Sequence, residues 1–292
     1  MVKLRRRTWL SGIILVIPLI LVLVVLVGYP LVELFFYSFH DMRYLKPNPK
    51  FIAFDNYIDV LTSPIFWTAM KNTLIWTFSS VALAFALGLV AALALNEKAL
   101  LTPIAKVSAI LPWLIPYPAV AVMWRFGFMS PFGFFDVILN YFGLTVKGGV
   151  LSNIPGAMIG VILTNVWKHY PFIMLMILAG LGQIPTELYE SAHIDGANSL
   201  ERFRYITFPL LKPIVIISLI IFTMWSMNGM VIVYIMTEGG PGYYTELNSL
   251  YVWRNAFQNF DFGIASAAAT INLCIGIVIA FAYLIFYRKY VW

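Results

Sequence analysis

The stretch ELYESAHIDGANSLERFRYITFPLLKP, residues 187–213, carries seven charged side chains between two strongly apolar segments. The segments on either side, residues 157–181 and 214–236, each reach the length of about 20 apolar residues that crosses the hydrocarbon core of a bilayer. A charged insert between two such segments predicts that the chain crosses a membrane, forms a structure on one side, and returns.

The composition supports a membrane protein. Of the 292 residues, 61% are hydrophobic and 11% are charged, whereas an ordinary soluble domain has roughly 25% charged residues. We therefore expect an all-α integral membrane protein with six transmembrane helices. The six apolar segments are residues 11–39, 73–95, 107–123, 157–181, 214–236 and 264–287.

The first segment resembles a signal peptide because it follows KLRRR. Its apolar core is far longer than the roughly 7–15 residues of a signal peptide, and no small-x-small cleavage site follows it. We expect an uncleaved helix. The third segment contains Pro112, Pro116 and Pro118, which lack the backbone N–H of a helical residue, so this helix should be kinked or unwound and should pack inside the bundle.

Lysine and arginine predict the orientation, because they accumulate on the cytoplasmic side. With the N-terminus inside, the cytoplasmic pieces are residues 1–10, 96–106, 182–213 and 288–292, which hold eleven Lys/Arg and five acids. The outer loops hold seven of each sign. Both termini and the charged insert are therefore expected in the cytoplasm. The excess of lysine and arginine over acidic residues is explained by this topology, so nucleic acid is not expected as a partner.

The insert reads as two short helices joined by a turn. Pro185 suits a first helical turn, Glu187 and Glu190 lie near that helix start, and Gly196 offers the left-handed conformation that ends a helix. Asn198 and Glu201 have the spacing of a capping box. The second helix should present an apolar face toward the membrane domain and end at two prolines; its members are Leu200, Phe203, Ile206 and Leu210, followed by Pro209 and Pro213. The alternatives are a docking element and a solvated linker.

The insert resembles the E-A-A motif of membrane subunits of ATP-binding-cassette importers. That motif reads E-A-A, three residues, G, nine residues, I-x-L-P, and here it reads Glu190-Ser191-Ala192, Gly196 and Ile206-Thr207-Phe208-Pro209. Further stretches resemble the carbohydrate-uptake group related to the maltose permease, in particular its F-type subunit. They are IDGA (194–197), FPLLKP (208–213), NVWKHYPF (165–172), LAGLGQIP (178–185), TEGGPG (237–242) and AFQNFDFGIASAAAT (256–270).

The resemblance implies a type I importer permease fold with an N-terminal helix and outer loop at 1–71, a five-helix core at 72–292, and a coupling loop at 185–213. It implies that a separate ATPase receives the coupling residues, which are Glu190, Ser191, Ala192, Asp195, Gly196 and Ala197. The sequence contains no G-x-x-x-x-G-K-[ST] phosphate loop, so ATP and magnesium should bind to that partner. The other implied partners are a G-type second permease, a second ATPase copy, an extracytoplasmic sugar-binding protein and the lipid of a prokaryotic cell membrane.

Polar and aromatic side chains within the spans are the candidates for a sugar site, because such groups are costly in a bilayer and sugars bind to aromatic faces and amide groups. The candidates are Asn165, Trp167, His169, Phe172, Trp225, Ser226 and Asn228. The alternative is that these groups hold helices together, with Lys168 pairing with a partner subunit or a helix end. No residues have the spacing of a metal site or of a nucleophile and its base.

Two classes of function remain open. One is a non-enzymatic permease subunit of an ATP-driven sugar importer, and the other is a stand-alone secondary transporter driven by an ion gradient. The second class usually requires paired intramembrane acids or internal repeats. Glu33 is the one acid in any predicted span, and no repeat is visible.

Overall fold

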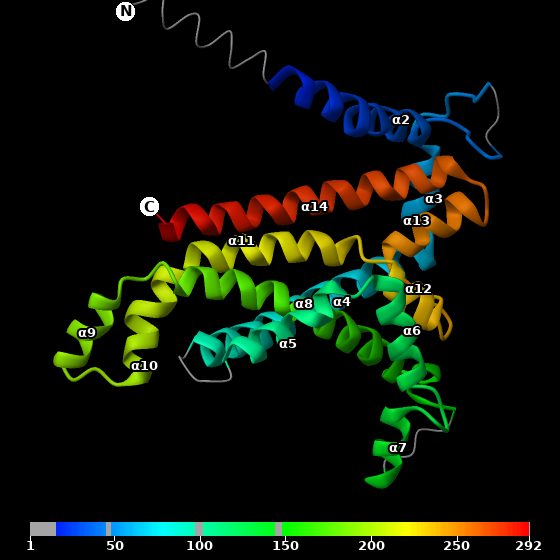
Figure 1. Cartoon of the computed structure of the whole chain (residues 1–292). Coiled ribbons are helices and arrows are strands. Elements are labelled where there is room, and N and C mark those ends of the chain that lie inside the picture. The colour runs from blue at the N-terminus through cyan, green and yellow to red at the C-terminus, as the bar shows by residue number, and fades with distance from the viewer. Residues whose placement is uncertain (1–15, 45–47, 97–101, 144–147, 292) are drawn as a thin grey trace, which may run out of the picture. The chain divides into compact units, whose positions relative to one another are not determined.

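The computed structural model describes residues 16–44, 48–96, 102–143 and 148–291. The chain divides into two compact units. The first contains residues up to 63 together with 252–273, and the second contains residues 64–251 together with those from 274 onward. Figure 1 labels the helices of both units.

The first unit begins with a helical run, Val16–Ser38, that includes the π-helical turn η1 (Val24–Gly28) and the helix α2 (Tyr29–Ser38). It agrees with the predicted first span over the part that is described. The short helix α3 (Asp55–Thr62) follows, and Nδ2 of its buried Asn56 donates hydrogen bonds to the carbonyl oxygens of Ser38 and His40, both at 3.0 Å. An ion pair of 2.7 Å between Arg43 Nε and Asp261 Oδ2 joins the two chain segments of this unit.

The second unit holds the second to fifth predicted spans, part of the sixth, and the charged insert. Its helices up to the insert are α4 (Pro64–Asn96), α5 (Thr102–Leu114), α6 (Tyr117–Gly127), α7 (Phe134–Tyr141), η2 (Val150–Ser152) and α8 (Gly156–Leu181). The insert and the helices after it are α9 (Thr186–Ile194), α10 (Ser199–Arg202), η3 (Phe203–Thr207), α11 (Phe208–Met227) and α12 (Val231–Thr237). Two further helices, α13 (Asn248–Phe257) and α14 (Phe262–Val291), belong partly to each unit.

The prediction of six apolar spans is confirmed when a bent pair is counted as one. In the described part of the chain, five helical runs are long and apolar enough to cross a membrane. The sixth is the pair Pro103–Leu114 and Tyr117–Gly127, which bends by 96°. The kink predicted from the three prolines is therefore confirmed, and the break falls at Ile115 and Pro116. The prediction that this segment packs inside the bundle is wrong for α5 within the described chain, because Val107, Leu111 and Leu114 are 65%, 52% and 66% exposed.

The predicted fifth span, residues 214–236, is wrong at both ends. A continuous helical run extends from Ser199 to Met227, and a separate helix, α12, begins at Val231. The apolar sequence continues across this break, so hydropathy alone gives no sign of it. The run changes direction between α10 and α11 (Figure 1).

Pro209 and Pro213 do not end the second helix of the insert, contrary to prediction. The π turn η3 carries the helix onward, with the N–H of Phe208 bonded to the carbonyl of Phe203. Pro209 then occupies the first turn of α11, where the missing N–H costs little. The predicted apolar face is covered only in part by this chain, since Leu200 is 73% and Leu210 is 48% exposed, whereas Phe203 and Ile206 are partly buried.

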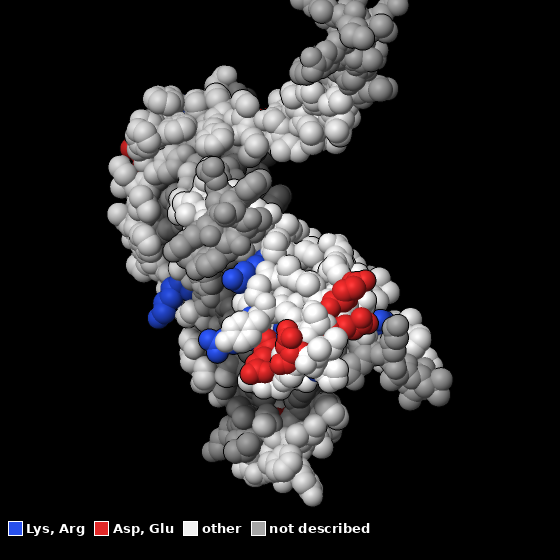
Figure 2. Space-filling view, turned by 90° about the vertical axis from the view of Figure 1, so that its left-hand side faces the viewer, with Lys and Arg blue, Asp and Glu red and all other residues white. Residues whose placement is uncertain are grey.

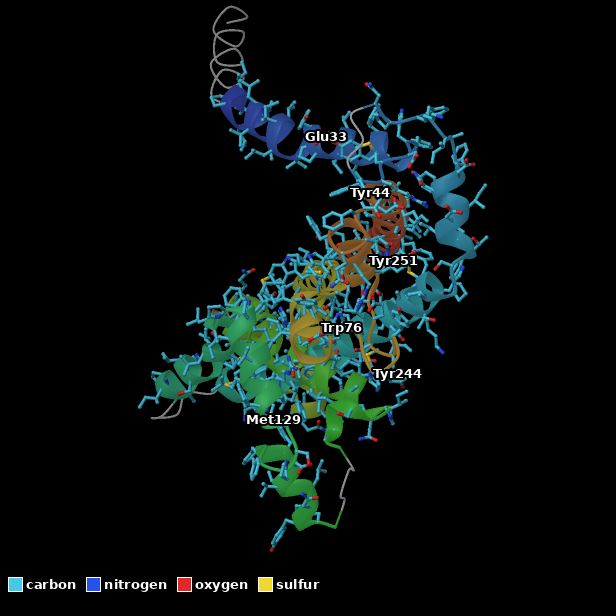
Figure 3. All side chains as sticks on the ribbon, turned by 90° about the vertical axis from the view of Figure 1, so that its right-hand side faces the viewer. Glu33, Tyr44, Trp76, Met129, Tyr244 and Tyr251 are labelled. Carbon is cyan, nitrogen blue, oxygen red and sulfur yellow. The ribbon has the colours of Figure 1, made fainter. Side chains whose placement is uncertain are left out.

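Close packing of α4 against α8 forms much of the core of the second unit. Gly88 on α4 faces Ile173 on α8 so closely that an added Cβ would overlap the isoleucine side chain. Small residues at such positions let membrane helices approach each other. Trp76, also on α4, is fully buried nearby in the same unit (Figure 3). The residues around Trp76 form the site described next.

Candidate functional site

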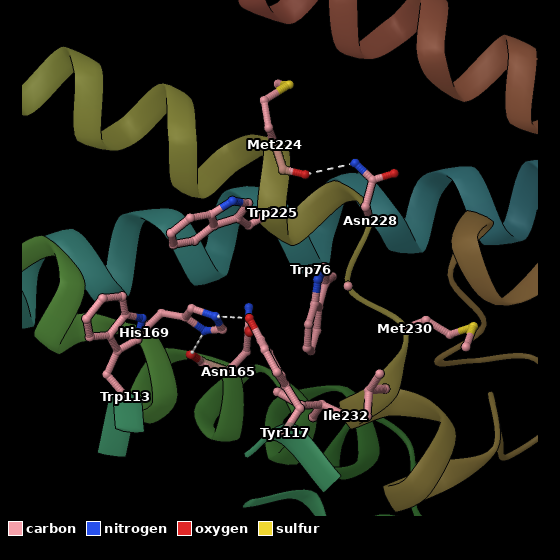
Figure 4. A pocket seen from close by; sticks show the side chains of 12 residues that line it. Trp76, Trp113, Tyr117, Asn165, His169, Met224, Trp225, Asn228, Met230 and Ile232 are labelled. Carbon is pink, nitrogen blue, oxygen red and sulfur yellow. Dashed lines mark hydrogen bonds between the residues drawn. The ribbon is translucent and has the colours of Figure 1, made fainter. Parts of the chain in front are cut away.

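A cavity of about 500 Å³ lies within the second unit. Small-molecule sites commonly have volumes of roughly 300–1,000 Å³. Helices α4, α5, α6, α8, α11 and α12 all contribute to its wall (Figure 4). The lining residues are Trp76, Trp113, Tyr117, Asn165, His169, Met224, Trp225, Asn228, Gly229, Met230, Val231 and Ile232.

The break between α5 and α6 brings two aromatic residues to this cavity. Trp113 comes from the end of α5 and Tyr117 from the start of α6. A broken helix leaves carbonyl groups without an intrahelical partner, which is costly at membrane depth. Lys168 of α8 supplies the missing donors, with its Nζ 2.6 Å from the carbonyl oxygens of both Trp113 and Ile115 and 3.3 Å from that of Pro112. Lys168 therefore pairs with a helix end.

A chain of hydrogen bonds connects α6 to α8 along the cavity. The hydroxyl of Tyr117 lies 2.8 Å from Nε2 of His169, and Nδ1 of His169 lies 2.8 Å from the carbonyl oxygen of Asn165. A carbonyl oxygen only accepts, so Nδ1 carries the proton. In the neutral imidazole Nε2 then accepts from Tyr117, and this fixes the orientation of both rings (Figure 4).

Polar contacts also join α11 to α8 and to α4. Nδ2 of Asn165 lies 3.5 Å from Oγ of Ser226, and Nε1 of Trp76 donates to the carbonyl oxygen of Ser226 at 3.0 Å. Asn165 and Ser226 are buried, at 3% and 2% exposure. Trp225 is 42% exposed and packs on Phe172 with ring centroids 4.8 Å apart. The wall thus combines rigid aromatic faces with a few fixed polar groups.

The structure brings most of the predicted sugar-site residues together. Asn165, His169, Trp225 and Asn228 line the cavity. Ser226 and Phe172 do not line it but contact residues that do, Asn165 and Trp225 respectively.

Trp167 lies elsewhere. It lines a separate apolar hollow and packs edge-on against Trp124 at 5.7 Å. Three aromatic residues of the cavity wall were not predicted: Trp76, Trp113 and Tyr117. For Trp113 and Tyr117 the signal in the sequence was their position beside Pro112, Pro116 and Pro118, where a broken helix exposes side chains to an interior space. Trp76 lies on α4, far from these prolines in the sequence, and has no such signal.

The charged insert has the local geometry that its sequence predicts. Gly196 has a φ of +80° and ends α9. Its N–H donates to the carbonyl of His193, and the N–H of Ala197 donates to that of Ala192, which together form a Schellman motif. Asn198 and Glu201 form the predicted capping box, with each side chain accepting from the backbone of the other residue.

The insert presents polar and apolar groups to its surroundings. Acidic side chains gather on the face of the molecule that the insert forms (Figure 2), and the exposed members are Glu187, Glu190, Asp195 and Glu201. Ile194 is 85% exposed beside them. Of the other predicted coupling residues, Ser191 and Gly196 are exposed, and Ala192 and Ala197 are partly buried. Tyr189 ties α9 to η3 through a 2.9 Å hydrogen bond to Thr207, so the exposed groups are held on a fixed frame.

Comparison with known proteins identifies the family. Residues 84–291 match the model of the binding-protein-dependent transport system inner membrane component. The chain belongs to this family. It is therefore a multi-pass inner-membrane permease subunit that works with a binding protein, and the alternative of a stand-alone secondary transporter is set aside.

Similar proteins cover nearly the whole chain. The trehalose/maltose transport system permease protein MalF of Thermococcus litoralis is 35% identical, over 97% of this chain and 95% of its own length. The sulfoquinovosyl glycerol transport system permease protein SmoG of Agrobacterium fabrum is 34% identical, over 94% of this chain and 89% of its own length. A crystal structure of a bacterial ABC transporter involved in import of the acidic polysaccharide alginate matches with a TM-score of 0.79 and 26% identity, over 98% of both chains. The fold predicted from the resemblance, a type I importer permease, is confirmed.

Proposed function

We propose that this chain forms the translocation pathway of an ATP-driven carbohydrate importer together with a similar second permease subunit. The observation that carries the proposal is the cavity of about 500 Å³ with aromatic walls and fixed amide groups. The similar proteins named above serve trehalose and maltose, sulfoquinovosyl glycerol, and alginate, which are all carbohydrates.

The chemistry of the wall suits a sugar ring. The faces of Trp113, Tyr117 and Trp225 offer apolar surface for the C–H groups of a pyranose. Asn165 and Asn228 carry amides that can donate to and accept from hydroxyl groups. The space offered by this chain is one wall of a pathway that the second permease completes.

The charged insert is proposed to be the contact with a separate ATPase, which binds ATP and magnesium. The support is the resemblance of the motif together with the exposure of Glu190, Asp195 and Ile194 on a rigidly capped frame. A docking element of this kind transmits force only if it is rigid, and the Schellman motif and capping box provide that rigidity.

We also infer the organisation and orientation predicted from the sequence. The core comprises residues 72–292 after an N-terminal helix and outer loop at 1–71, and both termini lie in the cytoplasm. The distribution of lysine and arginine supports this orientation. The partners are one further permease, two copies of the ATPase, and an extracytoplasmic sugar-binding protein.

The experiment is to reconstitute the complete transporter in vesicles and to measure ATP hydrolysis with its binding protein and a panel of solutes. Maltose, trehalose, sulfoquinovosyl glycerol and alginate oligosaccharides represent carbohydrates, and methionine serves as the non-carbohydrate control. Stimulation by at least one carbohydrate and not by methionine is expected. Stimulation by methionine alone would overturn the substrate class, and absence of a co-purifying ATPase would overturn the assembly.

A further inference from the structure

The helix α7 exposes an apolar surface that nothing in the described chain covers. Four of its residues, Phe134, Val137, Ile138 and Tyr141, follow the spacing that places side chains on one helix face. They are 66%, 55%, 38% and 86% exposed, respectively. We refer to these four residues as the α7 face.

The charged side chain of α7 points into the protein, whereas the charged side chains of a helix in water point toward the solvent. Asp136 is the one charged residue between positions 126 and 143, and it is 2% exposed. Its Oδ2 accepts hydrogen bonds from Oγ of Ser130 at 3.1 Å and from Nδ2 of Asn140 at 3.2 Å. With the acid satisfied inside and the large apolar groups outside, the helix is built for apolar surroundings.

Stacked aromatic rings hold α7 in this orientation. Phe135 packs against Phe128 with ring centroids 4.5 Å apart and against Trp124 of α6 with centroids 5.1 Å apart. The chain leaves α6 and turns at Met129 before α7 begins (Figure 3). Because Phe135 and Asp136 anchor one side of α7, the α7 face is directed outward by packing.

The apolar surface continues from α7 onto α6. Met123 and Phe126 of α6 are 48% and 62% exposed, and α6 is half of the bent transmembrane pair. Between the two helices lies a hollow of about 260 Å³. Its lining contains no charged residue and consists of Met123, Trp124, Gly127, Phe134, Phe135 and Trp167.

We propose that α7 lies in the membrane–water interface, where lipid acyl chains cover the α7 face and enter the hollow. Three observations favour lipid over a protein partner. The surface is continuous with a span of a membrane protein, it carries no charge that would pair with a partner, and it is rich in aromatic rings, which concentrate at bilayer interfaces. The interface would thereby fix the C-terminal end of α6. Tyr117, at the other end of the same helix, would then be held in its place in the aromatic wall of the cavity.

Spin labelling of the complete transporter in nanodiscs tests this proposal. Cys274 is the chain's only cysteine, so its replacement by serine allows single labels to be placed at Val137 and at Tyr141. Both positions are more than half exposed, so a label there leaves the packing of α7 intact. Matched controls are a label at Val90 of α4, 65% exposed on a span, and one at Gln258, exposed in the loop after α13 that is predicted to lie outside the membrane.

The measurement is the rate of collision of each label with molecular oxygen, which concentrates in lipid, and with a water-soluble nickel complex. We expect oxygen to dominate at Val137 and Tyr141, as at Val90, and the nickel complex to dominate at Gln258. Dominance of the nickel complex at both α7 positions would show that the face lies in water and would overturn the proposal. Low collision rates with both reagents would show that a protein subunit covers the face, and would overturn it equally. Because the readout needs neither ATP nor sugar, it is independent of the proposed substrate.

Discussion

The ammonium group of Lys168 lies 2.6 Å from the carbonyl oxygen of Ile115, at the point where α5 and α6 separate. An ammonium group has three N–H donors, and three carbonyl oxygens lie within hydrogen-bonding distance of this one. Lys168 is 3% exposed, so the pairing takes place away from water. The positive charge also suits the negative end of a helix dipole. Lys168 thus stabilises the break that places Trp113 and Tyr117 in the cavity.

Lys168→Met should destabilise the protein, because it leaves three buried carbonyl groups without donors. A hydrogen bond to a charged group contributes roughly 1.5–3 kcal/mol, so we expect a loss of free energy of unfolding in this range. The measurement is the midpoint of thermal unfolding of the purified transporter. Lys168→Arg keeps the charge and the donors and should recover part of the loss. The control is Lys71→Met, the same change at an exposed lysine of α4, which should leave the midpoint nearly unchanged. Equal midpoints for both methionine variants would contradict this role.

The break itself was predictable from the sequence, whereas the cavity was only partly so. Prolines act locally, so Pro112, Pro116 and Pro118 predicted a disrupted helix without knowledge of its neighbours. The caps at Gly196 and Asn198 were predictable for the same reason.

The composition of the cavity depends on which helices meet, and a single sequence does not contain that information. Trp76 on α4 was missed, and Trp167 was grouped with residues from which the structure separates it. The end of the fifth span was missed because the sequence stays apolar beyond Asn228, and apolarity does not distinguish one helix from two.

Topology gives a second prediction. If the positive charges have been interpreted correctly, a tag inserted within residues 141–152 is accessible from outside intact cells, and a tag after Trp292 is not. The chemical basis is that lysine and arginine remain on the cytoplasmic side during insertion. Protease or antibody access from one side measures it, and permeabilised cells provide the control in which both tags react. Reaction of both tags in intact cells would contradict the six-span orientation.

Asn165→Ala should weaken transport with the assembly intact, because it removes an amide that lines the cavity and leaves the backbone carbonyl that holds His169. A lost buried hydrogen bond costs about 1–3 kcal/mol, which corresponds to roughly 5–150-fold in apparent affinity. Ser226→Ala should have a smaller effect in the same direction, since Oγ acts only through Asn165 and the carbonyl that accepts from Trp76 remains. Initial uptake rates against sugar concentration measure both, and unchanged kinetics in both variants would place the site elsewhere.

Two tryptophans provide a matched pair. Trp225→Phe shrinks an aromatic face inside the cavity, whereas Trp167→Phe makes the same chemical change in the separate hollow. We expect Trp225→Phe to raise the sugar concentration at half-maximal uptake by several-fold, in keeping with about 1 kcal/mol for part of an aromatic contact. Trp167→Phe should leave that concentration unchanged. The reverse result would make the second hollow the sugar site.

The last prediction concerns the φ angle of Gly196. Nothing lies within 4 Å of a Cβ added there, so a side chain at this position meets no steric obstacle and only the φ of +80° is at issue. Valine is strained in this conformation by roughly 1–2 kcal/mol, whereas asparagine adopts it readily. Gly196→Val should therefore misdirect Asp195 and Ala197 at the end of α9, and Gly196→Asn should not.

The helices of the membrane core do not depend on this turn, so both variants should be recovered in near-normal amounts. We expect Gly196→Val to lose sugar-stimulated ATP hydrolysis in reconstituted vesicles, because closure of the ATPase no longer reaches α8 and α11 through the insert. Gly196→Asn should retain most of the activity. Gly143→Val is the control for backbone strain alone, because it introduces the same strain far along the chain from the insert. Gly143 has a φ of +74° and, like Gly196, has nothing within 4 Å of its Cβ position. Normal sugar-stimulated hydrolysis by Gly196→Val, or equal losses in the two valine variants, would show that the insert is a linker and not the contact through which the ATPase acts.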